Sequence, residues 1–140
     1  MFQKIHDINK LYEISNTIRQ DIIIMLLEAG SGHSAGPLGM ADVFTALYFN
    51  VLNHDPNNTS FPDRDRVVLS NGHICPVQYA TLARAGYFPV EELKTLRKLG
   101  TRLHGHPHNL ALPGIENSAG PLGQGLSIAC GMAYAAKLDN

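Results

Sequence analysis

The N-terminal part of the chain shows a helical pattern of apolar positions. Between residues 8 and 29, apolar side chains recur three, four or seven positions apart, which is the repeat of one helical face. The pattern predicts one long helix over Ile8–Ala29. Because residues 22–27 are apolar all round, we expect this helix to run from solvent into the interior. Gly30 and Gly32 then favour a loop at its inner end, and this loop presents His33.

The rest of the chain predicts more helices and one strand. A second helix has Pro37 in its first turn and continues to about Leu52. The branched apolar run Val67–Leu69 favours a buried parallel strand at about residues 66–70. Further helices are expected over residues 77–85, 89–99 and 122–138, with an irregular loop over residues 101–117. The many small residues of the last helix predict tight packing against a neighbour.

This order of elements predicts an α/β fold that is mostly helical here and has one parallel strand at about residues 66–70. A parallel strand needs neighbours to cover its edges, and no second strand is predicted. We therefore interpret residues 1–140 as one incomplete domain.

Composition and charge argue against several classes of partner. Eleven basic and twelve acidic residues give a formal net charge of −1, so we expect no nucleic acid and no membrane partner. The longest apolar run is far shorter than the ~20 residues of a membrane span, and the N-terminus lacks the apolar core of a signal peptide. We expect a soluble, cytoplasmic protein. Cys75 and Cys130 form no C-x-x-C motif and are interpreted as buried core residues.

A repeated hexapeptide marks two predicted helix starts. Ser-Ala-Gly-Pro-Leu-Gly occurs at residues 34–39 and again at residues 118–123. Glycine before proline permits a sharp turn, and the free N–H groups of the following helix could meet an anion or a cofactor. The alternative is that both copies only begin helices. The flanking sequences differ, which argues against an internal duplication.

Three histidines each follow a glycine on a predicted loop: His33, His73 and His106. A histidine in this setting can donate to a phosphate or exchange a proton near neutral pH. A single loop histidine is more often a structural hydrogen-bonding residue, but three on similar loops favour a shared site. A metal site made by His104, His106 and His108 is the weaker interpretation. It lacks a fourth ligand at suitable spacing, and Pro107 constrains the backbone between two of them.

Six motifs in order resemble the N-terminal, diphosphate-binding domain of transketolase. The resemblance covers nearly the whole chain and is close to the split form, in which the N- and C-terminal halves are separate polypeptides. The motifs are Ile18-Arg19-Gln20-Asp21, Gly30-Ser31-Gly32-His33, Gly36-Pro37-Leu38-Gly39-Met40-Ala41, Leu69-Ser70-Asn71-Gly72-His73, Gly105-His106-Pro107 and Gly120-Pro121-Leu122-Gly123-Gln124-Gly125.

The resemblance implies a fold, a cofactor and a reaction. The chain would be the N-terminal part of a thiamine-diphosphate-binding fold, in a dimeric enzyme of the pentose phosphate pathway. Thiamine diphosphate would carry a two-carbon glycolaldehyde unit from a ketose phosphate to an aldose phosphate. The partners implied are sugar phosphates and a C-terminal transketolase subunit in a homodimer-type assembly.

The resemblance also implies roles for individual residues. His33 would contact substrate oxygens and assist proton transfer, and His106 would meet hydroxyl groups of the donor. His73 would contact the cofactor diphosphate. The loop residues of the second hexapeptide would line the thiazolium and diphosphate; they are Gly120, Pro121 and Leu122.

The sequence departs from the family by lacking the Gly-Asp-Gly motif and the downstream Asn that hold Mg²⁺ or Ca²⁺ in the complete enzyme. No metal ligands are therefore assigned here. The glutamate that activates the cofactor belongs to a C-terminal domain that is also missing, so we expect no activity from the chain alone and weak cofactor binding. Two alternatives stay open. One is a non-catalytic assembly module that pairs with a full-length homologue, and the other is a fragment of a deoxyxylulose-phosphate synthase, whose motifs fit less well.

Overall fold

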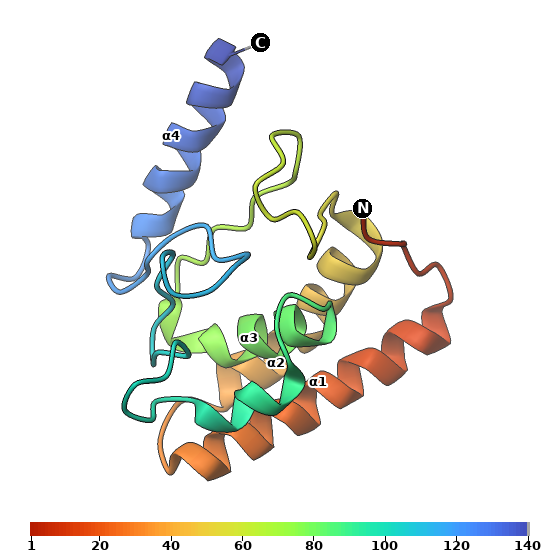
Figure 1. Cartoon of the computed structure of the whole chain (residues 1–140), viewed down its shortest axis with the longest axis vertical. Helices are drawn as coiled ribbons and strands as arrows, with labels where there is room; N and C mark the ends of the chain where they lie inside the picture. The colour runs from red at the N-terminus through yellow and green to blue at the C-terminus, as the bar shows by residue number, and fades with distance from the viewer. Residues whose placement is uncertain (140) are drawn as a thin grey trace.

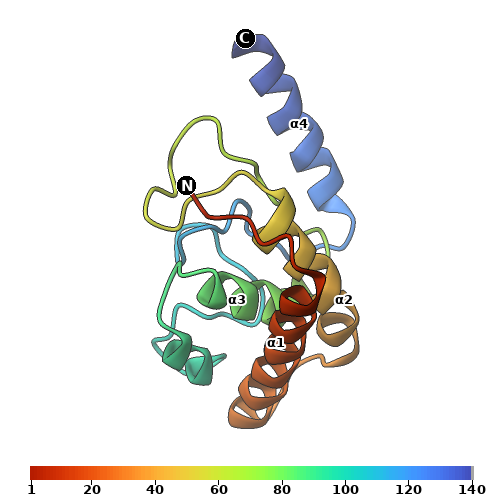
Figure 2. The same cartoon turned by 90° about the vertical axis from the view of Figure 1, so that its right-hand side faces the viewer.

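Three helices pack together in the computed structural model, which describes residues 1–139, and a fourth helix projects away from them (Figures 1 and 2). The helices α1, α2 and α3 contact one another in pairs and enclose the core. The elements are α1 (Ile8–Ala29), α2 (Ala35–Ala46), the π-helix η1 (Leu47–Val51), the 3₁₀ turn η2 (Gly72–Ile74), α3 (Cys75–Arg84), the 3₁₀ helix η3 (Val90–Thr95) and α4 (Gln124–Asp139).

Helix α1 has the predicted bounds and a clear signal at each end. The Asp7 carboxylate accepts from the Asn9 N–H at 2.9 Å, which caps the N-terminus. Gly30 has a φ of 62° and ends the helix in the left-handed conformation. One apolar face of α1, which includes Ile18, Ile22 and Met25, is fully buried against the other helices.

The prediction that α1 runs into the interior was wrong. Ile23 and Leu27 are 55% and 77% exposed, and His33 on the following loop is also exposed. The helix lies along one side of the bundle (Figure 1). An α-helix has 3.6 residues per turn, so consecutive side chains point to different sides of the helix. When the core lies on one side only, the apolar residues on the other side stay exposed.

Helix α3 forms the centre of the bundle. Every residue from Cys75 to Ala83 is buried, and α1, α2 and η3 all contact it. Its last residue, Arg84, pairs with Asp21 of α1 through two hydrogen bonds of 2.7 and 2.8 Å. A bidentate pair of this kind fixes the relative position of the two helices.

The strand predicted at about residues 66–70 is not present, and residues 1–139 contain no strand. A side chain occupies the position that a neighbouring strand would take. The Asn117 side chain accepts from the Leu69 N–H and donates to the Leu69 carbonyl oxygen, both at 3.0 Å. Leu69 is buried and Val67 and Val68 are half-buried, but a single extended segment cannot form a ladder without a second one.

The helix predicted over residues 89–99 is also wrong. The structure has only the short 3₁₀ helix η3, because Leu96 turns to an extended ψ of 127° and Arg97 takes a positive φ of 60°. The residues from 101 to 117 form turns and irregular backbone, as predicted.

Helix α4 begins at Gln124 rather than at Leu122, and Gly125 is its one buried residue among those described. Cys75 is buried, whereas Cys130 on α4 is exposed, which corrects the interpretation of both cysteines as core residues. Small side chains allow close packing, but they cannot supply the neighbour. Within residues 1–139, no helix is long and apolar enough to cross a membrane.

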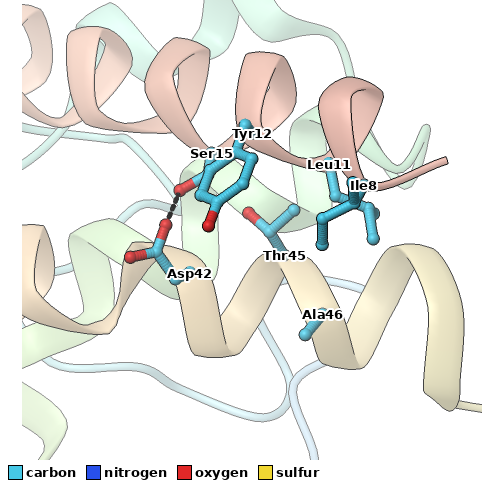
Figure 3. Close-up of a pocket in the computed structure, with 7 residues that line it drawn as sticks. All are labelled: Ile8, Leu11, Tyr12, Ser15, Asp42, Thr45 and Ala46. Carbon is cyan, nitrogen blue, oxygen red and sulfur yellow. Dashed lines mark hydrogen bonds between the residues drawn. The ribbon is translucent and has the colours of Figure 1, made fainter.

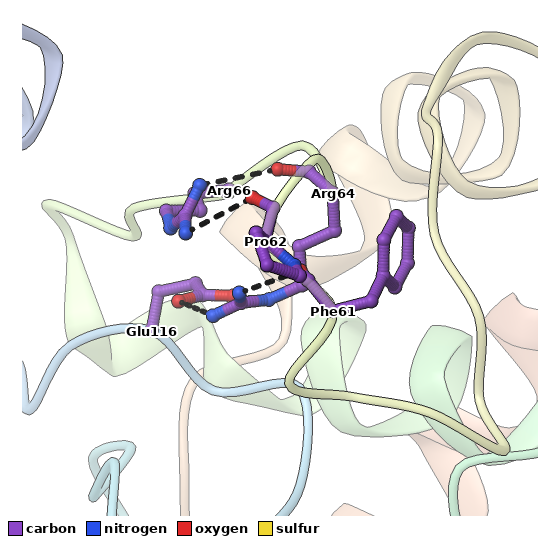
Figure 4. Close-up of polar contacts among 5 residues, drawn as sticks. All are labelled: Phe61, Pro62, Arg64, Arg66 and Glu116. Carbon is purple, nitrogen blue, oxygen red and sulfur yellow. Dashed lines mark hydrogen bonds and ion pairs between the residues drawn. The ribbon is translucent and has the colours of Figure 1, made fainter. Parts of the chain in front are cut away.

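The loop before the predicted strand is fixed by arginines (Figure 4). Arg64 makes two hydrogen bonds to the Glu116 carboxylate at 3.0 and 3.2 Å and a third to the Phe61 carbonyl oxygen. Arg66 donates to the carbonyl oxygens of Arg64 and Pro62. These contacts join the loop around residue 62 to the loop that carries His106.

Candidate functional site

The structure brings His33 and His73 together from separate elements. His33 lies on the loop between α1 and α2, and His73 lies in the turn η2, just before α3. Their ring centroids are 5.0 Å apart, with the rings edge to face at 64°. His33 is exposed and His73 is half-buried, so both rings are accessible to a ligand.

His106 reaches the same turn from a third loop. A Cβ atom built on Gly72 would lie 3.0 Å from Cδ2 of His106 and 2.8 Å from Cβ of Ala119. Gly72 therefore has no room for a side chain, and this lets the His106 ring lie beside the backbone that carries His73. Three histidines from three loops therefore lie at the turn η2, and a fourth loop, which carries Ala119, also contacts this turn.

Both copies of the hexapeptide border this turn. In the first copy, a Cβ atom on Gly36 would lie 2.6 Å from Cγ2 of Ile74, so the start of α2 packs directly on η2. In the second copy, Ala119 contacts Gly72, and its N–H donates to the Pro107 carbonyl oxygen at 3.1 Å. The repeat therefore marks two segments on either side of the same turn.

The residues Gly120, Pro121 and Leu122 lie on the exposed part of the second segment. A Cβ atom on Gly120 would have no neighbour within 4 Å, so this glycine makes no close backbone contact, unlike Gly36. The close approach occurs instead at Gly125, where a Cβ atom would lie 2.7 Å from Cα of Ser70. The Gly125 N–H also donates to Ser70 Oγ at 3.1 Å.

Sequence reasoning missed two side chains of α3 that donate hydrogen bonds to the loop of His106. The Cys75 thiol donates to the Gly105 carbonyl oxygen at 3.3 Å, and the Tyr79 hydroxyl donates to the His104 carbonyl oxygen at 2.9 Å. Burial raises the pKa of Cys75 to about 12, so the thiol keeps its proton and is a donor rather than a nucleophile. No local motif distinguishes Cys75 and Tyr79 from other residues of a buried helix.

The described residues contain no group of three or more His, Cys, Asp or Glu side chains that could hold a metal ion. In the histidine-rich loop, the rings of His104 and His108 are 5.8 Å apart, edge to face.

A separate hollow of about 260 Å³ lies between α1 and α2 and contains none of the candidate histidines (Figure 3). Its floor is polar at one end, where Ser15 donates to Asp42. Hydrogen bonds from Arg19 and Ser15 lower the pKa of the Asp42 carboxyl, which keeps it charged. None of its lining residues belongs to the loops that meet at η2, so the hollow is not part of the candidate site.

The comparisons with known proteins identify the family. Residues 11–140 match the model of the transketolase, thiamine diphosphate binding domain. The chain belongs to this family, as its motifs predicted. It spans only 18% or 19% of the length of the first curated transketolases that it matches.

One curated relative and two solved structures show how far the similarity extends. The 6-deoxy-6-sulfo-D-fructose transketolase subunit SqwG of Clostridium sp. (strain MSTE9) is 44% identical over 126 residues, which are 90% of this chain and 46% of the subunit. Transketolase from Leishmania mexicana is 40% identical with a TM-score of 0.85, covering 88% of this chain and 18% of that one. Pichia stipitis transketolase in complex with sedoheptulose 7-phosphate is 43% identical with a TM-score of 0.78, covering 81% and 17%.

Proposed function

We propose that this chain supplies one wall of the active site of a transketolase, which transfers a two-carbon ketol unit between sugar phosphates. The observation that carries this proposal is the meeting of His33, His73 and His106 at the turn η2. Membership of the thiamine diphosphate binding family supports the cofactor class. In this proposal the enzyme is cytoplasmic and dimeric and serves the pentose phosphate pathway.

The donor set fits the charged end of thiamine diphosphate. Imidazole N–H groups are hydrogen-bond donors, and the first N–H groups of α2 lack a side-chain cap from Ser34. His73 would hold a diphosphate oxygen, with Gly120, Pro121 and Leu122 beside the ring system. When bound, thiamine diphosphate supplies the carbon nucleophile that carries the two-carbon unit. His33 and His106 would hold the substrate hydroxyls, and His33 would move a proton at a substrate oxygen.

The donor set does not fit the divalent ion. A diphosphate without its metal leaves concentrated negative charge that faces only imidazoles and backbone N–H groups. We propose that Mg²⁺ or Ca²⁺ is held by residues outside this sequence and that a partner polypeptide completes the site. One relative is named as a transketolase subunit, which supports assembly of the enzyme from more than one polypeptide. The chain alone is then inactive and binds thiamine diphosphate weakly, and tight binding in a calorimetric titration would contradict this.

A complementation assay tests the proposed function. The purified chain is mixed with thiamine diphosphate, Mg²⁺ and a polypeptide that contains the rest of a transketolase, and ketol transfer is measured. We expect activity only with the complementing polypeptide. His33→Ala should lower kcat by about 100-fold or more, with little change in cofactor affinity.

The matched control is His108→Ala, which removes an exposed histidine from outside the turn η2. It should leave activity unchanged. No activity from a folded chain with its complement, or equal effects of the two substitutions, would refute the proposal.

A further inference from the structure

Arg97 has a backbone conformation that calls for an explanation. Its φ of 60° is the only positive value at a non-glycine residue among residues 1–139. Left-handed backbone is unfavourable for a residue with a Cβ atom, and it persists only where the surroundings enforce it. The Arg97 N–H donates to the Leu103 carbonyl oxygen at 2.9 Å, which fixes this backbone beside His104.

The unusual backbone places the guanidinium between two of the loops that form the site. On one side, Nη1 donates to Ser31 Oγ at 3.2 Å, two residues before His33. On the other side, the guanidinium lies against Gly105, where a Cβ atom would be 2.7 Å from Nε and 3.0 Å from Nη2. Gly105 stands directly before His106.

Arg97 connects the loop of Ser31 with the loop of His106. Cys75 and Tyr79 hold the loop of His106 to α3, whereas Ser31 is exposed and reaches that loop through Arg97. The guanidinium makes no ion pair within residues 1–139, so its position serves no salt bridge of the described fold.

We infer that Arg97 is a positioning residue that sets the distance between His33 and His106. It acts by joining the Ser31 side chain to the backbone at Gly105. The consequence for catalysis rests on the proposed function, but the joining of the two loops does not. Displacing a substrate-binding group can lower the reaction rate by a large factor. The distance between His33 and His106 should therefore affect the rate of ketol transfer.

Arg97→Gly separates this role from a purely structural one. Glycine accepts the positive φ, so the thermal midpoint of the chain should stay the same or rise. The guanidinium is lost, however, so the NMR signals of the His33 and His106 rings and of the Ser31 amide should shift. The matched control is Lys98→Ala, which removes the neighbouring cation that pairs with Glu28 at 3.6 Å. The inference is wrong if the shifts after Arg97→Gly are no larger than those after Lys98→Ala.

A second substitution approaches the same link from the other loop. In Gly105→Ala the new methyl group would displace the guanidinium, so the Ser31 amide should shift as it does in Arg97→Gly. The two substitutions combined should shift it no further. An unchanged Ser31 amide in Gly105→Ala would overturn the inference.

An activity readout completes the test. In the complemented assembly, Arg97→Gly should lower kcat about tenfold or more, with a smaller change in KM. Unchanged kcat would refute the catalytic consequence. If the wild-type assembly is itself inactive, the proposed function fails, while the NMR signals still decide whether Arg97 joins the loops.

Discussion

Helices α3 and α4 have similar residue types but very different surroundings. Both are rich in alanine and other small or apolar residues, yet α3 is buried from Cys75 to Ala83 and α4 buries only Gly125 among its described residues. Helix α3 is covered on several sides, while α4 extends away from the body (Figures 1 and 2). Burial therefore depends on whether a partner is present, and composition only permits it.

The same difference divides the candidate site. Cys75 and Tyr79 belong to the buried side, where they donate hydrogen bonds to the loop of His106, and His73 lies in the turn directly before them. The segment of Gly120–Leu122 belongs to the exposed side and is held near the turn by Ala119 and by the contact of Gly125 with Ser70. The loop of His106 is thus held by the buried helix α3, and the segment Gly120–Leu122 is held by a few local contacts.

Truncating one leucine in each helix gives the largest expected contrast. Leu82 on α3 is 0% exposed, and Leu126 on α4 is 70% exposed. Leu82→Ala should lower the free energy of unfolding by about 3 kcal/mol, because it removes buried methyl groups and leaves a cavity. Leu126→Ala should change it by less than about 0.5 kcal/mol. Urea unfolding of both variants measures the difference, and similar losses would show that α4 packs on the body in solution.

A smaller effect is expected where Asn117 replaces a neighbouring strand. Asn117→Ala removes two buried hydrogen bonds to Leu69 and leaves both backbone groups unpaired. The free energy of unfolding should fall by about 2 kcal/mol. Asn109→Ala is the matched control, because Asn109 is exposed. Its side-chain oxygen accepts from the Ser118 hydroxyl, and its backbone N–H donates to the same hydroxyl oxygen. Equal losses in the two variants would mean that the segment beside Leu69 does not depend on Asn117.

The smallest effect near neutral pH concerns His54, a buried histidine on the loop that follows η1. Its Nε2 lies 2.6 Å from the Tyr48 carbonyl oxygen, which only accepts, so Nε2 carries the proton and Nδ1 accepts from the Tyr87 hydroxyl at 2.9 Å. Burial lowers the pKa of His54. As the pH falls below about 6.5, the unfolded chain therefore binds a proton more readily than the folded chain.

The free energy of unfolding should thus be unaffected by His54 above about pH 7 and should decrease on acidification below about pH 6.5. Urea unfolding at about pH 7.5 and about pH 5 should show a smaller acid-induced loss in His54→Gln than in the wild type. His108→Gln, at an exposed position, should keep the wild-type loss. An equal acid-induced loss in all three proteins would contradict the assignment to His54.

Local signals in the sequence predicted the elements that local chemistry determines. Asp7 and Gly30 stand at the ends of a periodic apolar segment, and α1 has the predicted bounds. The motifs around His33, His73 and His106 indicated the family, which the comparison over residues 11–140 confirmed. The roles of these histidines stay predictions.

The failures occurred where a distant residue decides the outcome. The strand at about residues 66–70 depended on a neighbour, and the side chain of Asn117 takes that position. The helix over residues 89–99 stopped early because Arg97 turns toward Leu103 and Ser31. Asn117 and Ser31 are far from these segments in the sequence, and no periodic pattern marks them.

The sequence by itself determined where the chain can turn, which faces are apolar and which glycine-linked histidines it offers, because these depend on residue type and on near neighbours. Only the tertiary structure decided that three of those histidines meet at Gly72, that Cys75, Tyr79 and Arg97 support them, and that α3 is buried while α4 is not. The reason is physical: burial and close approach require a second surface, and that surface comes from residues far away along the chain.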